Sequence, residues 1–208
     1  TITCGEGGAL VTDDEALYEV IQAYTDHGHD HKGRDRGADL HPHIGTNFRI
    51  SELHAAVGLA QLAKADRILA TQRAHKKFLK EGLADLPNVT FREVPDPEGD
   101  SAGFLSFFLP TEEAARAALK RLSEAGVDGC FYWYDNNWHY PRRWEHFKKL
   151  ISPNTLAIAR LEPERSWENL ELPASDAIMS RNISMLIKLS WTQAELEERL
   201  QKMRAALA

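Results

Sequence analysis

Two polar residues directly before an apolar segment have the types and spacing expected of an anion-binding site. Asn47 and Arg49 lie within Ile44–Leu62, IGTNFRISELHAAVGLAQL, just ahead of a predicted helix that Ser51 can cap. An amide group and a guanidinium both donate hydrogen bonds, and the first turn of a helix favours negative charge. We therefore interpret Asn47 and Arg49 as candidate binding residues, placed by a turn onto the start of the helix.

A second candidate is the aromatic run Phe131–Tyr140, FYWYDNNWHY. Aromatic faces stack on the C–H groups of sugars, and asparagine and aspartate side chains bind hydroxyl groups, so the run suits a carbohydrate or another polyhydroxylated ligand. An amphipathic strand end packed within its own domain explains the same composition equally well. His139 is the one group of the run that titrates near neutral pH, although a lone histidine is more often structural than catalytic.

The segment His27–His43 contains five of the nine histidines. The alternation of His27, His29 and His31 could suggest a metal site, but no cysteine or helical histidine pair supports one, and we predict no metal. A long, charged loop with glycines is more typical of a mobile active-site or interface loop.

The two cysteines, Cys4 and Cys130, cannot form a disulfide framework and favour a reducing compartment, which we predict to be the cytoplasm. The net charge of −6 argues against nucleic acid or a membrane surface as a partner. No apolar run is long enough to span a membrane. The sequence contains no nucleophile elbow, no phosphate loop and no zinc motif.

The elements expected to position the first candidate site come from the first third of the chain. Thr1–Thr12 predicts two short strands around a glycine turn, and a capping box of Thr12 and Glu15 predicts a helix that ends near Asp26–Gly28. A helix from Ser51 to about Leu86 follows, with a break or bend near Gln72. Its predicted buried stripe has three-and-four spacing and consists of Leu53, Ala56, Val57, Ala60 and Ala63.

The remaining sequence alternates short strands and helices, which is typical of a small α/β sandwich with helices on one face of a sheet. The predicted strands are Val89–Val94, Phe104–Leu109, Val127–Tyr134 and Leu186–Trp191. Helices are predicted at Thr111–Ala125 and after a capping box of Thr192 and Glu195. The last helix has a stripe of Leu196, Leu200, Met203 and Leu207.

Several motifs, in order, resemble the second half of the DegT/DnrJ/EryC1/StrS sugar aminotransferases. The matching segments are Thr3–Thr12, Asp26–Gly28, Gly45–Leu53 and Ala55–Leu62. The resemblance implies an α/β chain with the fold-type I architecture of pyridoxal 5′-phosphate (PLP) transferases. It assigns residues 1–72 to the C-terminal part of the PLP-binding large domain and residues 73–208 to the small C-terminal α/β domain.

The resemblance also implies how the site is divided. The family's Schiff-base lysine immediately precedes the segment that matches Thr1–Thr3, so we expect it just upstream of Thr1 and assign no catalytic residue within this sequence. Asn47 matches an asparagine that reaches the PLP phosphate of the neighbouring subunit. Arg49 matches an arginine near that same site, where it could hold a carboxylate. The resemblance therefore implies a homodimer with shared active sites.

The resemblance, together with the aromatic run, implies a substrate. We predict Tyr134, Asn137 and His139 as sugar-binding residues, with His139 at a position where many family members carry a histidine. The run is more similar to the branch that aminates C8 of oxidised 3-deoxy-manno-octulosonate (Kdo), with glutamate as amino donor. Cationic contacts to such an acid could come from Arg49 or from Lys32, Arg34 and Arg36. Two alternatives are a nucleotide-diphosphate keto-sugar aminotransferase and a non-catalytic PLP- or sugar-sensing regulator.

Overall fold

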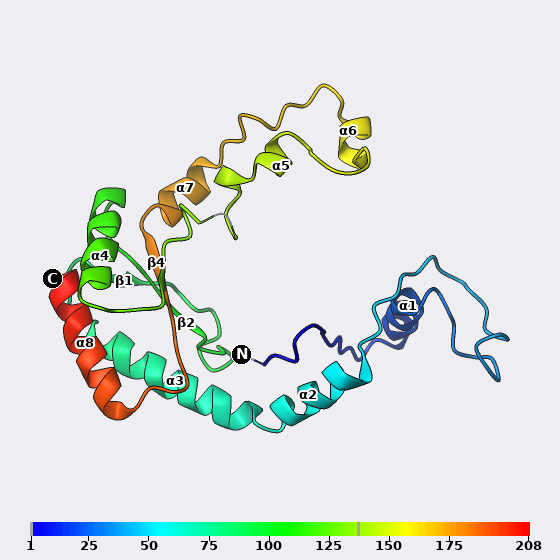
Figure 1. Ribbon diagram of the computed structural model, residues 1–208, viewed down its shortest axis with the longest axis horizontal. Helices are drawn as coiled ribbons and strands as arrows, with labels where there is room; N and C mark the ends of the chain where they lie inside the picture. The colour runs from blue at the N-terminus through cyan, green and yellow to red at the C-terminus, as the bar shows by residue number, and fades with distance from the viewer. Residues whose placement is uncertain (1, 137) are drawn as a thin grey trace. The chain divides into compact units, whose positions relative to one another are not determined.

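A computed structural model describes residues 2–136 and 138–208, and it divides between Arg67 and Ile68 into two compact units (Figure 1). Each unit is described by itself. The assignment of residues 1–72 and 73–208 to large and small domains stays a prediction. In the described part of the chain, no helix is long and apolar enough to cross a membrane.

The first unit contains two helices, each begun by a side-chain cap. Helix α1 spans Glu15–Thr25, and the Asp14 carboxylate accepts a hydrogen bond from Leu17 N. The predicted Thr12 cap is wrong, because the Thr12 hydroxyl bonds to Asp14 N instead and so supports the capping residue. The predicted strands at the start are also wrong: residues 2–12 contain no strand.

Helix α2 spans Glu52–Leu62, and Ser51 caps it by accepting a hydrogen bond from His54 N, as predicted. The predicted break near Gln72 is wrong. The helix ends at Leu62, where Lys64 N bonds back to Gln61 O in a tight i−3 turn, and helix α3 then runs over Ala65–Gly82. Gln72 is buried inside α3, where its amide donates to Ile187 O at 3.3 Å.

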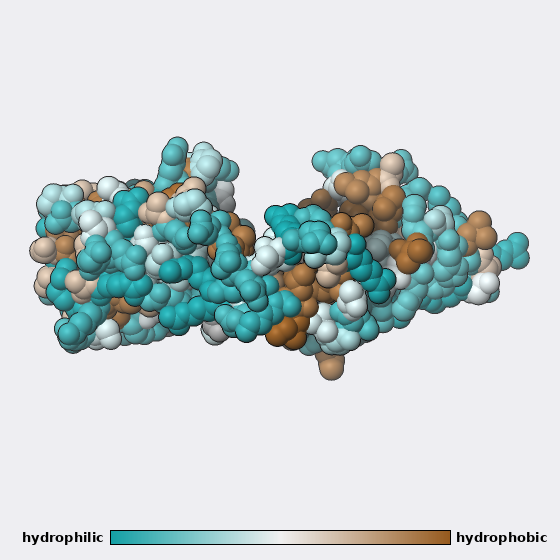
Figure 2. All heavy atoms as spheres, turned by 90° about the horizontal axis from the view of Figure 1, so that it is seen from above, coloured by the Kyte–Doolittle hydropathy of each residue, from teal (hydrophilic) through white to brown (hydrophobic). Residues whose placement is uncertain are grey.

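Large apolar side chains of the first unit lie at the surface (Figure 2). Helix α2 has no buried residue, and the Leu53 side chain is 80% exposed, so the predicted burial of the α2 stripe is wrong within this chain. Helix α1 buries only Ala23. An apolar helix face of this kind is expected to be covered by protein, which gives the unit a surface suited to association.

A short backbone pairing joins the end of α1 to the segment that carries Asn47. Asp26 and Asn47 form an antiparallel bridge, and Thr46 N and Phe48 N donate to the carbonyls of Tyr24 and Thr25 at 2.8 and 2.9 Å. The chain can return here because Gly28 has a φ of +91° and lies against the backbone of His43. The Asn47 position is therefore fixed by backbone hydrogen bonds to α1.

We expect Gly28→Ala to destabilise this pairing. A methyl group on Gly28 would lie 2.1 Å from the His43 carbonyl oxygen, at a φ that alanine rarely adopts. The expected loss is about 1–3 kcal/mol of unfolding free energy, measured by urea unfolding. Gly8→Ala is the matched control, because a methyl group there meets no atom within 4 Å. Equal unfolding curves for the two variants would contradict this prediction.

The second unit is built on a four-stranded antiparallel sheet with the order β1-β2-β4-β3. The strands are β1 (Thr90–Phe91), β2 (Phe104–Phe108), β3 (Cys130–Phe131) and β4 (Asn182–Leu186). The predicted strand Leu186–Trp191 is wrong, because the strand ends where that segment was expected to begin. Beyond it, side chains of α3 bind the backbone: Gln72 bonds to Ile187 O, and His75 Nδ1 lies 3.0 Å from Lys188 O.

Three helices pack their apolar stripes on one face of this sheet. These are α3, α4 (Glu112–Glu124) and α8 (Gln193–Leu207). The predicted capping box of Thr192 and Glu195 at the start of α8 is confirmed. The core residues of the sheet include Leu105, Phe107, Ile183 and Met185, which alternate along β2 and β4.

Between β3 and β4 the chain forms a series of short helices joined by loops (Figure 1). They are the 3₁₀ helix Pro141–Arg143, α5 (Glu145–Lys148), α6 (Ala157–Leu161) and α7 (Pro173–Met179). The Tyr140 hydroxyl anchors the start of this segment by donating to Asp176 Oδ1 of α7 at 2.5 Å.

Candidate functional site

Asn47 and Arg49 contact each other through the acceptor atom of the asparagine. Asn47 Oδ1 accepts hydrogen bonds from Arg49 N at 3.2 Å and from Arg49 Nε at 3.0 Å, an Asx-type turn. In the described part of the chain, the Asn47 Nδ2 group and the two Arg49 Nη groups have no hydrogen-bond partner. Both residues are exposed. The pair therefore presents an array of donors without acceptors, the chemistry that a phosphate or a carboxylate requires.

A buried carboxylate lies behind this pair. Asp26 is only 6% exposed, and its two oxygens accept from Arg36 Nη1 and Nη2 at 2.8 and 2.7 Å. Arg49 Nε lies 3.4 Å from Asp26 Oδ1, and His31 Nε2 lies 3.6 Å from Oδ2. The bidentate Arg36 contact, aided by the charge of Arg49, lowers the pKa of Asp26 to about 2. Asp26 was not among the site residues predicted from the sequence.

The pKa of Asp26 predicts an acid transition in this part of the chain. The unfolded chain takes up the proton at the ordinary pKa of 3.8, before the folded chain does at about 2. The stabilising contribution of Asp26 is therefore complete above pH 4 and is lost as the pH falls from about 4 to 2. We expect amide hydrogen exchange of residues 27–43 to accelerate over that range. In Asp26→Asn the exchange should show no such step; a step of unchanged size in that variant would contradict the assignment.

The histidine-rich loop is internally hydrogen-bonded. Asp30 N donates to Leu40 O at 2.9 Å, Gly33 N donates to Asp39 Oδ1 at 2.9 Å, and the His29 and His41 rings are 4.3 Å apart. Among the described residues, no group of three or more histidine, cysteine, aspartate or glutamate side chains is arranged to hold a metal ion.

The basic residues of the loop were candidates for substrate contacts, but two of them are engaged elsewhere. Lys32 pairs with Glu19 at 2.8 Å, and Arg36 binds Asp26.

The aromatic run of the second unit alternates between the two faces of the sheet. On the face away from the helices, Phe131 and Trp133 stack with their ring centroids 4.8 Å apart. Phe104 meets both rings edge-on at 6.1 and 6.2 Å, and the exposed His139 ring contacts Trp133 at 4.9 Å. These four residues form an aromatic platform, a surface of the kind on which sugar rings stack.

Tyr134 and Asn137 do not join this platform in the described structure. Tyr134 is buried in the core, beside the Tyr140 ring and beneath the Arg142 guanidinium, which lies 3.8 Å from the ring centroid. Burial raises the pKa of Tyr134. Asn137 lies outside the described residues. The ligand-binding roles of Tyr134, Asn137 and His139 stay predictions.

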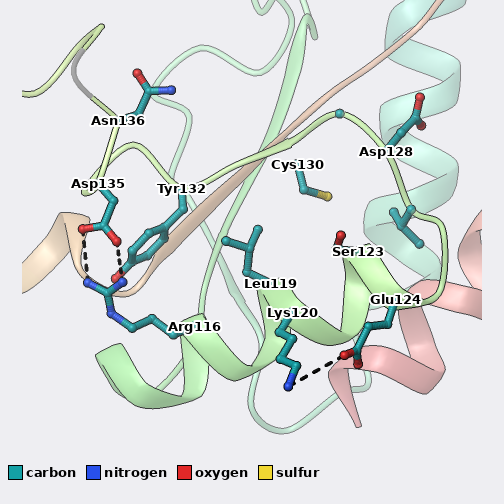
Figure 3. Close-up of a pocket in the computed structure, with 12 residues that line it drawn as sticks. Arg116, Leu119, Lys120, Ser123, Glu124, Asp128, Cys130, Tyr132, Asp135 and Asn136 are labelled. Carbon is teal, nitrogen blue, oxygen red and sulfur yellow. Dashed lines mark hydrogen bonds and ion pairs between the residues drawn. The ribbon is translucent and has the colours of Figure 1, made fainter.

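An open groove of about 920 Å³ lies between α4 and the segment 127–136 (Figure 3). An ion pair of Arg116 with Asp135 closes one end, and the Cys130 thiol lies in its wall. Burial raises the pKa of Cys130 to about 11, so the thiol stays protonated at neutral pH and is not an activated nucleophile. The groove therefore offers no activated cysteine.

Solved structures of sugar aminotransferases superimpose on nearly the whole chain. CalS13, a sugar aminotransferase from Micromonospora echinospora, superimposes with a TM-score of 0.69 at 20% identity, over 98% of this chain and 48% of that protein. The chain therefore has the α/β architecture of fold-type I PLP transferases.

The family follows from the sequence match. The model of the DegT/DnrJ/EryC1/StrS aminotransferase family matches residues 1–203, and this chain belongs to that family, whose cofactor is PLP. GDP-perosamine synthase of Escherichia coli O157:H7 is 36% identical over 43% of this chain and 23% of its own length. The sensory transduction protein EryC1 of Saccharopolyspora erythraea is 36% identical over 66% of this chain and 33% of its own. The chain thus spans half or less of the proteins that it matches.

Proposed function

We propose that this chain forms part of a PLP-dependent sugar aminotransferase that moves an amino group from glutamate to an oxidised sugar. The observation that carries the proposal is the family match over residues 1–203, which includes the segment of Asn47 and Arg49. The Schiff-base lysine is expected just upstream of Thr1. We assign it no position within this sequence.

The donor set around Asn47 fits the phosphate of the cofactor. Asn47 keeps an amide N–H group free of partners in the described residues while its oxygen is held by Arg49, so the donor and not the acceptor is available to an anion. When bound, PLP supplies the electron sink for moving the amino group. The role of Asn47 is to bind a phosphate oxygen, and that of Arg49 is to orient a carboxylate of the donor or the substrate.

We further propose that two copies of the chain share each site. The exposed apolar face of α2 supports this, because such a face is expected to be covered by protein. In a two-fold dimer, Asn47 and Arg49 of one subunit would serve the cofactor of the other. A cytoplasmic location stays a prediction.

For the sugar, we propose 8-oxo-3-deoxy-manno-octulosonate, which would give 8-amino-Kdo. The support is the aromatic platform beside His139, a surface on which a sugar ring can stack. A nucleotide-diphosphate keto sugar is the second candidate, supported by the 36% identity to GDP-perosamine synthase.

The test is an absorbance scan of the purified holoenzyme. Glutamate should shift the PLP band, and a 2-oxo acid should reverse the shift. The sugar that restores the band after glutamate identifies the substrate, so 8-oxo-Kdo and a GDP-linked keto sugar are added to separate samples. Restoration by the GDP sugar alone would overturn the Kdo proposal and leave the aminotransferase proposal intact.

A non-catalytic regulator is the remaining alternative, and the identity to the sensory transduction protein EryC1 favours it specifically. A PLP band that glutamate does not shift would support that alternative over an aminotransferase.

A further inference from the structure

Three segments of the first unit meet at the Asp26 carboxylate. Asp26 ends α1, and its backbone pairs with that of Asn47. Arg36, from the histidine-rich loop, binds both carboxylate oxygens, and Arg49 Nε lies 3.4 Å from one of them. The Asp26 side chain thus links both the loop and Arg49 to the end of α1, in addition to the backbone hydrogen bonds that join α1 to the Asn47 segment.

The burial of Asp26 restricts the conformations that its partners can adopt. A buried carboxylate that lacks partners is costly, so the conformations that keep the carboxylate paired are strongly favoured. Those conformations hold Arg49 with its Nε directed toward Asp26 and Asn47. The Arg49 side chain is nevertheless 49% exposed, so its two Nη groups remain accessible to a ligand.

We propose that Asp26 is a positioning residue that orients Arg49 and Asn47 for binding an anionic ligand. The inference rests on the proposed function and deepens it: Asn47 binds the phosphate of PLP, the neighbouring Arg49 keeps its side chain beside Asn47, and Asp26 orients both without touching the ligand. A guanidinium held at its Nε cannot rotate away, so its Nη donors and the neighbouring amide start from the geometry of the bound state.

The charge of Asp26 lets experiment separate positioning from electrostatics. Asp26→Asn removes a negative charge close to Arg49. If charge alone mattered, the variant would bind an anion more tightly than the wild type. Loss of positioning has the opposite sign, because asparagine keeps only one acceptor oxygen and no charge, which breaks the two-oxygen contact with Arg36 and the ion pair with Arg49. We expect Asp26→Asn to raise the dissociation constant of PLP, measured by titrating the apoenzyme, by about tenfold.

Asp30→Asn is the matched control. It makes the same change of charge four residues away, in the histidine-rich loop, but among the described residues Asp30 accepts hydrogen bonds only from the backbone of Lys32 and Leu40. We expect its PLP affinity to equal that of the wild type within about twofold. Urea unfolding of both variants establishes that they are folded. Unchanged or tighter PLP binding by folded Asp26→Asn overturns the proposal.

A double-mutant cycle that combines Asp26→Asn with the pair Asn47→Ala and Arg49→Ala tests whether Asp26 acts through these two residues. If Asp26 acts through these residues, Asp26→Asn should raise the dissociation constant less than about twofold once both are alanine. An equal tenfold rise in that background would show a general structural effect and overturn the positioning role. If the double alanine variant itself binds PLP like the wild type, the proposed function of the segment fails, whatever Asp26 does.

Discussion

Replacing Phe107 by alanine is expected to lower the free energy of unfolding by about 3–5 kcal/mol. Phe107 is fully buried on β2, paired with Ile183 of β4 and facing the helices that cover the sheet. Removal of the ring leaves a cavity that strands on both sides prevent from collapsing, so the loss of transfer free energy and the cost of the cavity add. Urea unfolding of the apoprotein, monitored by circular dichroism, measures the change.

Phe104→Ala is the matched control for this prediction. Phe104 lies on the same strand but is 38% exposed, on the aromatic platform of the opposite face. The same deletion should cost less than half as much there, because less apolar area leaves water. If the two variants unfold at the same urea concentration, the assignment of the core to the Phe107 face is wrong. Phe104→Ala should also reveal whether the platform binds the sugar, through a raised KM for that substrate.

The sequence predicted helices well where a local capping signal starts them. Ser51 caps α2 and Thr192 caps α8, each with the expected hydrogen bond. The predicted helix Thr111–Ala125 is confirmed as Glu112–Glu124, with Thr111 as its cap. A cap and an apolar stripe need only neighbouring residues, so a single sequence contains the information.

Strand limits depended on contacts that the sequence does not reveal. The segment Val127–Tyr134 has the composition of a strand, yet only Cys130–Phe131 pairs with β4. A φ of +74° at Gly129 precedes the paired residues, and a turn from Tyr132 O to Asp135 N follows them. The strand is therefore limited by the backbone on both sides, while its side chains still alternate between core and platform.

The polar site was predicted in part, for a similar reason. Asn47 and Arg49 were recognisable because two donors precede a capped helix. Asp26 was not, because its importance arises from Arg36, ten residues away through an irregular loop. No periodicity links those two positions. The pairing of Arg36 with Asp26 depends on how the loop folds back onto the end of α1.

The second large effect concerns cofactor binding. We expect Asn47→Ala to raise the dissociation constant of PLP by about tenfold to a hundredfold, because a hydrogen bond to a charged group contributes about 1.5–3 kcal/mol. The fold should be unaffected, since Asn47 is exposed and its backbone pairing with Asp26 needs no side chain. Titration of the apoenzyme with PLP, followed by absorbance, gives the constant.

Asn47→Asp separates the two functions of this side chain. The carboxylate keeps the acceptor that binds Arg49 N and Nε, so the local turn should persist. It replaces the amide N–H group by a negatively charged oxygen, which repels a phosphate and cannot donate to it. Asn47→Asp should therefore bind PLP more weakly than Asn47→Ala, although it retains more of the native contacts. The reverse order would mean that Asn47 acts by holding Arg49, and wild-type affinity in both variants would remove Asn47 from the phosphate site altogether.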